Sequence, residues 1–224
     1  MSIVNVKIPD TKVVRGSMIV GGPMLVIHNF AAKSRQQMLD KQMGITHEDE
    51  DRDPQAEYEA AKYIEKDHGW QGIKTMSFKK SMVNATRYVK GLDASKVKGL
   101  VFFFDDGVAL DPLGDGITRL HYESEFRHET IVRLSGPGRT PVVRFRPCYL
   151  NWWVKLNFEF LPSNISAEQI HHLMKWAGTS VGVGENRPER SGDVWGKFEL
   201  SPSWAGKVKR GRKAAKKTRT RKAA

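Results

Sequence analysis

The sequence predicts an α+β fold with an antiparallel sheet, and three observations lead to this prediction. The segment from Trp152 to Phe160 alternates apolar and polar side chains, as a strand with one buried face does. Directly after it, Ser166 and Gln169 form a capping-box pattern, which predicts the start of a helix. Residues 31–91 carry apolar side chains at helical spacing. Strands and helices are therefore expected within one chain of 224 residues.

The amino-terminal third is expected to contain one strand followed by helices. Residues 24–27, with the apolar run before them, read as a buried strand. In the helical region that follows, Asp53 precedes a proline, and this pair predicts a helix from Pro54 to about Lys66 because aspartate caps a helix and proline suits its first turn. Ser77 predicts the cap of a further helix.

From residue 99 onward the pattern becomes that of strands. A continuous apolar run that ends in an Asp-Asp-Gly turn predicts one strand, and alternation predicts others. The helix that begins at Ser166 is expected to end at Gly178, since glycine commonly stops a helix. The expected strands are Leu100 to Phe104, one or two within 117–134, Pro141 to Arg146, Trp152 to Phe160, and Trp195 to Leu200.

This order of elements is that of a ferredoxin-like (RRM-like) β-α-β-β-α-β unit with a helical insertion in its first crossover. We expect one α+β domain over residues 1–204, with the insertion at about 31–91 and a β-rich core at 99–200, followed by a tail, 205–224. Helices cover one face of such a sheet and leave the other open. The residues expected on the open face are Arg144, Arg146, Trp153 and Lys155.

The positive charge of the chain is concentrated in the tail. The formal net charge is +12, but residues 1–204 hold 27 basic and 25 acidic residues. The tail has ten basic residues and no acid, so it is expected to be disordered and to contact phosphates without reading bases. These basic residues are Lys207, Lys209, Arg210, Arg212, Lys213, Lys216, Lys217, Arg219, Arg221 and Lys222.

Several classes of protein are excluded or disfavoured. The single cysteine, Cys148, excludes an intramolecular disulfide and a multi-cysteine zinc site. No stretch approaches the roughly 20 apolar residues that span a bilayer, and the first residues show no signal-peptide pattern. The sequence therefore predicts an intracellular, cytoplasmic protein with no membrane partner.

The most informative segment is a glycine-rich loop, residues 182–196, between the predicted helix and the last strand. Glycine lets another backbone approach closely, and arginine contacts phosphate with two hydrogen bonds or stacks on a base. The loop is therefore interpreted as an element that binds a nucleic-acid backbone, or else as a tight connection in a fold used for assembly. Its candidate binding residues are Gly182, Gly184, Arg187, Arg190, Gly192 and Gly196.

The same loop does not have the pattern of a nucleotide-cofactor site. Gly182 and Gly184 lack a third glycine at Rossmann spacing, and they follow a helix instead of joining a strand to one. No Lys-Ser or Lys-Thr pair of the Walker type follows them. We therefore expect no cofactor, and no metal either.

A loop with this order of glycines and basic residues resembles the glycine-rich loop of the RAMP superfamily, the RNA-binding proteins of CRISPR effector complexes and CRISPR RNA processing. The matching residues are Gly182, Gly184, Arg187, Gly192, Gly196 and Phe198. The body from about Arg127 to Leu200 is also similar to bacteriophage proteins of unassigned function. The resemblance implies a ferredoxin-like core that holds RNA, in the cytoplasm of a host cell if the protein is phage-encoded.

Catalytic candidates are weaker than binding candidates. RAMP-type RNA-processing enzymes often use a histidine, but no histidine here has a supporting arrangement that assigns it a role. Asp105, Asp106, Asp111 and Asp115 stand among glycines and a proline, which favours a turn over a two-metal site. Cys148 has no spacing relationship to a histidine. The histidines considered are His28, His121, His128, His171 and His172.

The sequence leads to three functional hypotheses. The first is a non-enzymatic protein that binds single-stranded RNA, or DNA, through the glycine-rich loop and the open sheet face, with the tail adding nonspecific affinity. The second is a self-assembling phage component, or an inhibitor that imitates a CRISPR RNA-binding subunit within a host complex. Trp153 suits either, because tryptophan stacks on bases and also forms subunit interfaces. A metal-independent RNA-processing nuclease ranks third.

Overall fold

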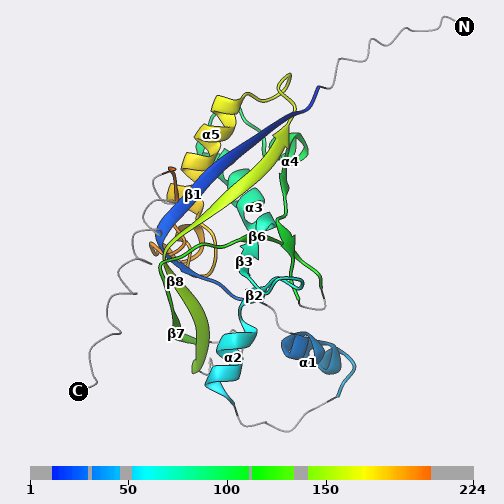
Figure 1. Cartoon of the computed structure of the whole chain (residues 1–224), viewed down its shortest axis with the longest axis vertical. Coiled ribbons are helices and arrows are strands. Elements are labelled where there is room, and N and C mark those ends of the chain that lie inside the picture. Colours follow the sequence, from blue (N-terminus) through cyan, green and yellow to red (C-terminus); the bar gives the residue numbers. More distant parts are fainter. Residues whose placement is uncertain (1–11, 30–31, 46–51, 111–112, 134–140, 203–224) are drawn as a thin grey trace, which may run out of the picture.

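The computed structural model describes residues 12–29, 32–45, 52–110, 113–133 and 141–202. The basic tail and Asp111 lie outside the described residues. Figure 1 shows an elongated molecule with the main sheet and its helices at one end. A long β-hairpin and the helix α2 extend at the other end. The fold is a mixed one of helices and antiparallel sheets, as the sequence predicts.

The main sheet has four strands in the order β4-β8-β1-β9, and a fifth strand, β7, pairs with a different part of β8. Among the described residues, all neighbouring strands of this sheet pair in the antiparallel direction. The two longest strands, β1 and β8, form the centre of the sheet and pair over most of their length. The bounds are β1 Val14–Val26, β4 Val101–Phe104, β7 Ser124–Arg133, β8 Pro141–Phe160 and β9 Glu199–Leu200.

The prediction of two separate strands at 141–146 and 152–160 is wrong, because both belong to the single 20-residue strand β8. Asn151 explains why the sequence pattern hides this continuity. Its φ of 48° lies in the left-handed region and interrupts the regular alternation of side chains. Accordingly, the core cluster contains the even-numbered Trp152 after Asn151 but the odd-numbered Tyr149 before it. The side of β8 away from the cluster carries Arg144, Arg146, Trp153 and Lys155.

One face of the main sheet is covered by the helices α3, Thr75–Ala85, and α5, Ala167–Trp176 (Figure 1). Phe78 of α3 is fully buried, with its ring centroid 6.4 Å from that of Trp152 and 5.8 Å from that of Phe198. A short helix, α4, Ala94–Leu100, leads into β4. The covered face therefore holds the main hydrophobic core.

The start of α5 agrees with the prediction, whereas its end does not. Ser166 and Gln169 form the expected capping box, with the Gln169 N–H donating to the Ser166 hydroxyl over 3.2 Å. After α5 the chain continues as a π-helical turn, Ala177–Val181, and Gly178 lies inside that turn. The chain leaves the turn at Gly182, whose φ is 74°. Gly178 is glycine because a Cβ there would overlap the carbonyl group of Phe198.

The predicted helical insertion at 31–91 is only partly helical. It contains α1, Ala32–Gln42, and α2, Pro54–Ala60, which Asp53 caps as expected. The helix expected to reach Lys66 ends early because the chain enters a second, four-stranded sheet. The further helix begins at Thr75, not at Ser77. The strands of the second sheet are β2 Tyr63–Ile64, β3 Gln71–Lys74, β5 Gly107–Val108 and β6 Gly116–Arg119.

A buried polar cluster holds α2 against the hairpin formed by β7 and the first half of β8, which we name the hairpin arm (residues 124–133 and 141–150). The Lys62 ammonium lies 2.8 Å from the Glu125 carboxylate, and both side chains are largely buried. Burial opposes both charges, but the mutual contact prevails, so the pKa of Glu125 is lowered and that of Lys62 is raised. The Tyr58 hydroxyl also donates to Glu125. The arm is thus fixed to the insertion at its base.

Candidate nucleic-acid interface

The glycine-rich loop is folded along the outer edge of β1, beyond the point where β9 pairs with that strand. The Glu185 N–H donates to the carbonyl of Val26 over 2.8 Å, and the Gly196 N–H donates to the carbonyl of Met24 over 2.9 Å. These bonds satisfy backbone groups that an unpaired strand edge would leave exposed. The loop therefore has a defined conformation without a ligand.

Two of its glycines are required by the packing of the chain itself. A Cβ at Gly196 would overlap the carbonyl oxygen of Val183, and one at Gly184 would overlap that of Val26. Both residues also have φ near the left-handed value, 65° and 79°. Gly192 differs, since the space around it is open. The sequence predicts that another backbone approaches these glycines closely. At Gly184 and Gly196 the backbone that does so is the protein's own.

The two arginines of the loop have different surroundings. Arg187 is part-buried, with its Nε 3.6 Å from a carboxylate oxygen of Glu189. Asn84 of α3 donates to the same carboxylate over 3.0 Å. Arg190 lies on the short helix α6, Pro188–Ser191, where it is exposed and forms no ion pair with a described residue. Of the two, Arg190 is the one free to meet a phosphate.

Glu185 brings a third predicted residue, Arg146, into contact with the loop. One Glu185 carboxylate oxygen, Oε1, lies 3.6 Å from Nε of Arg146 and 3.4 Å from Nδ1 of His28. Burial opposes ionisation of Glu185, but these two partners favour it, and its pKa is lowered overall. Arg146 is itself buried. Its charge is therefore largely compensated within the protein.

A cleft of about 330 Å³ lies between the loop and α3. Its apolar part comes from Ile27, Ile73, Val181 and Val183. Its polar lining comes from α3, from the loop and from His28, which follows β1. The polar residues are His28, Ser77, Lys80, Ser81, Asn84, Glu185, Arg187 and Glu189.

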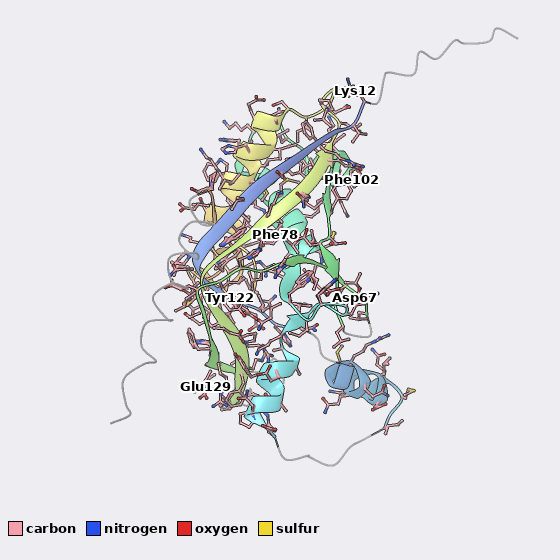
Figure 2. All side chains as sticks on the ribbon, in the orientation of Figure 1. Lys12, Asp67, Phe78, Phe102, Tyr122 and Glu129 are labelled. Carbon is pink, nitrogen blue, oxygen red and sulfur yellow. The ribbon has the colours of Figure 1, made fainter. Side chains whose placement is uncertain are left out.

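The face of the main sheet opposite α3 and α5 carries aromatic and basic side chains. By register, Phe102 pairs with Glu159 and Phe104 with Asn157 on the side that faces away from the core. Phe102 is 48% exposed and Phe104 38% exposed. Figure 2 shows Phe102 near the edge of the molecule, whereas Phe78 lies in its interior. We name this surface the open face; on it lie Arg15, Phe102, Phe104, Lys155 and Asn157.

Phe102, Phe104 and Arg15 are site candidates that the sequence interpretation missed. The continuous apolar run 100–104 predicts a strand but not its place in the sheet, and β4 is a short edge strand with only one side in the core. The Arg15 guanidinium carbon lies 5.6 Å from the centroid of the Phe104 ring. A depression of about 380 Å³ adjoins them, lined by Arg15, Gly16, Phe104, Asn157 and Phe158. The signal in the sequence is the spacing of Phe102 and Phe104, which are two residues apart and therefore share one face of a strand.

Trp153 and Lys155, predicted on the open face, lie on β8 in that register. The Trp153 ring is part-buried and stacks on His121, with centroids 3.9 Å apart and planes 7° apart. Its indole face on that side is therefore occupied by the protein. Lys155 is exposed. Of Trp153 and Lys155, Lys155 is therefore the more accessible to a ligand. Arg144, the other basic residue predicted here, is part-buried on the hairpin arm.

The catalytic candidates remain dispersed. His171 and His172 are exposed on α5, while His128 of β7 packs edge-on against Trp195, with centroids 4.7 Å apart. Burial raises the pKa of the Cys148 thiol to about 11, which keeps it protonated at neutral pH. Among the described residues, no three His, Cys, Asp or Glu side chains gather in a way that could hold a metal ion.

Comparison with known proteins gives no assignment: no protein-family profile matches the sequence, and no curated protein matches it significantly. Within the described ranges, no helix combines the length and apolarity needed to cross a bilayer.

Proposed function

We propose that this protein binds single-stranded nucleic acid, RNA in preference to DNA, without catalysing a reaction on it. The observation that supports this most directly is the exposed pair Phe102 and Phe104 on the open face, with Arg15 and Lys155 beside them. Unpaired bases stack on such rings, and neighbouring cations contact the phosphates between the bases. Stacking tolerates any base, so the predicted binding is largely independent of sequence.

We also infer that the core is ferredoxin-like and RAMP-type. In chain order the strands β1, β4, β8 and β9 are the first to fourth, and their spatial order, β4-β8-β1-β9, is 2-3-1-4. Helices α3 and α4 precede the second of these strands, and α5 precedes the fourth. This arrangement supports a split β-α-β pair, with the second sheet and α1 and α2 as insertions. In folds of this kind the helix-free face is available to a ligand.

The glycine-rich loop has a smaller part in this proposal than the open face. Arg187 and Arg146 are paired with carboxylates, which leaves Arg190 as the exposed cation of the loop. The ten basic residues of the tail add affinity that depends on salt and not on sequence. Binding by the body and binding by the tail should therefore be separable by ionic strength.

The test uses a full-length variant in which the ten basic tail residues are replaced by glutamine, which we name the tail-neutral variant. Its affinity for a labelled single-stranded RNA of about 15 nucleotides is measured by fluorescence anisotropy. Phe102→Ala with Phe104→Ala should weaken binding about tenfold or more, because stacking contributes roughly 1–3 kcal/mol per base. Phe126→Ala is the matched control, since this ring on β7 is 41% exposed but lies on the hairpin arm. Equal affinities for the three proteins would exclude the open face.

A second candidate function, self-assembly or docking in a larger protein complex, is favoured by a separate observation. Met38, Leu39 and Met43, on or beside α1, are exposed apolar side chains. In addition, Gly184 and Gly196 of the loop pack against the protein's own backbone, and Glu185 and Arg187 form ion pairs within the protein. Light scattering of the tail-neutral variant, before and after nuclease treatment, separates the two functions. Assembly that persists after nuclease treatment supports the second.

A further inference from the structure

The cleft between α3 and the glycine-rich loop has the features of a preformed ligand site. Ser77, Lys80, Ser81 and Asn84 recur at helical spacing, so one stripe of α3 forms its polar wall. Ile27, Ile73, Val181 and Val183 give it an apolar floor. Small-molecule sites are typically concave and mostly apolar, with a few fixed polar groups, and begin at about 300 Å³. A volume of about 330 Å³ suits one aromatic ring with a small polar substituent.

Two groups in the lining have unused binding capacity. The Glu185 carboxylate is part-buried, and its contacts with His28 and Arg146 are made through Oε1. Lys80 is exposed and forms no ion pair with a described residue. A carboxylate oxygen accepts hydrogen bonds from an amino group, and an ammonium group binds phosphate.

The charge balance of the cleft favours an anion in spite of its two carboxylates. Glu189 is paired with Arg87 over 3.3 Å and with Arg187 over 3.6 Å. Glu185 is paired with Arg146. With Lys80, four cations therefore stand against two carboxylates, which leaves two positive charges in and around the cleft.

The geometry of the cleft is set before any ligand arrives. Gly184 and Gly196 fix the loop against β1 and against itself, and Glu185 is held by its backbone bond to Val26. A site that needs no rearrangement loses less free energy on binding. Lys80 lies on α3 and Glu185 in the loop, so a ligand that contacts both must bridge the two segments.

We propose that this cleft binds one nucleotide whose base carries an exocyclic amino group. The base lies on the apolar floor, its amino group donates to Oε2 of Glu185, and its phosphate binds Lys80. The nucleotide is either free or one residue of a bound strand; only in the second case does the inference rest on the proposed function. The chemistry of recognition is the same in both.

The test compares cytidine and uridine monophosphate by titration calorimetry of the tail-neutral variant. The two ligands share sugar and phosphate and differ at position 4 of the base, an amino group against a carbonyl. Cytidine monophosphate should bind about tenfold more tightly, because the carbonyl of uridine is, like the part-buried Glu185 carboxylate, an acceptor and forms no hydrogen bond with it. Equal affinities, or no saturable binding of either ligand at millimolar concentration, would overturn the proposal.

Substitutions in the cleft provide the second arm. Lys80→Gln should weaken both nucleotides about tenfold by removing a charged contact to the phosphate. Lys96→Gln, an exposed lysine of α4 outside the cleft, is the matched control and should change affinity less than about twofold. Ser77→Phe should fill the cleft and abolish binding, with folding verified by circular dichroism. Binding that survives both Lys80→Gln and Ser77→Phe contradicts the assignment.

Competition identifies the source of the nucleotide. If unlabelled single-stranded RNA displaces cytidine monophosphate from the tail-neutral variant, the cleft holds a residue of the strand. If both bind together, it holds a free nucleotide. The variant with Phe102→Ala and Phe104→Ala separates the two proposals, because loss of the open face should leave cytidine monophosphate binding intact. Failure of the open-face proposal is then distinguishable from failure of the cleft.

Discussion

The glycine-rich loop and the open face differ in how much of their chemistry is already used within the protein. In the loop, Arg187 is paired with a carboxylate, Glu185 with a cation, and Gly196 accommodates the chain's own backbone. On the open face, Phe102 and Phe104 remain about half and over a third exposed. The loop has the stronger sequence signal, and the open face has the more available surface. A motif made of glycine and arginine therefore indicates close packing as readily as it indicates a ligand.

The physical origin of this difference lies in what each residue type does when no ligand is present. Glycine serves a tight fold and a ligand approach equally, because both need the absence of a Cβ. An arginine near a carboxylate pairs with it. The rings of Phe102 and Phe104 lie near cations of the protein, Lys79 and Arg15, and yet remain exposed. Exposed large apolar groups in proximity commonly mark a binding surface.

The largest expected effect concerns the structural role of the loop glycines. Gly196→Ala should lower the free energy of unfolding by about 3 kcal/mol or more, because the new methyl group would overlap the Val183 carbonyl and the residue has positive φ. Gly192→Ala is the control: it has the same strained φ but open space, so we expect about 1 kcal/mol. Urea denaturation measures both. Equal losses would show that packing does not require Gly196.

A smaller effect is expected at Glu185, whose ion pairs show how far the charges of the loop are used within the protein. The folded-state pKa of Glu185 is lowered, so its contribution to stability is present above the unfolded pKa and lost as pH falls through the folded value. Glu185→Gln should therefore cost roughly 1 kcal/mol at neutral pH and much less near pH 3. Urea denaturation of both proteins at the two pH values gives the difference. A deficit that does not change with pH would contradict an ionic role.

The smallest effect distinguishes the two arginines. In the tail-neutral variant, Arg190→Gln should weaken single-stranded RNA binding about threefold, the loss of one exposed phosphate contact. Arg187→Gln should have a smaller effect, because Glu189 already engages that guanidinium. Fluorescence anisotropy at fixed salt compares them. If Arg187→Gln proved the more harmful, the loop and not the open face would be the principal contact.

Local signals in the sequence predicted local structure well. The capping box at Ser166 and the aspartate cap at Asp53 formed as expected, because each depends on residues within one helical turn. The continuity of β8 could not be foreseen, since it depends on one residue with positive φ, Asn151. The short strands β2 and β3 were missed, because β2 has only two residues and β3 pairs with the distant strand β6.

The candidate sites show the same limit. The sequence singled out the loop by its composition and named Arg187 and Arg146 as binding candidates. It did not indicate that Glu189 and Glu185 pair with them. The cleft joins α3 to the loop, which lie about a hundred residues apart in the chain, as the 105-residue separation of Asn84 and Glu189 shows. Apolar runs likewise do not reveal which strand lies at a sheet edge, so the exposure of Phe102 and Phe104 was not predicted.

The unbroken course of β8 has a mechanical consequence. Because one strand belongs both to the main sheet and to the hairpin arm, no joint separates them along the backbone. A force applied to the arm, which Lys62 and Glu125 tie to α2, is transmitted through β8 to β1. The loop is bonded to Met24 and Val26 of that same strand. We therefore expect a displacement of the arm to reach the edge of β1 that holds the loop.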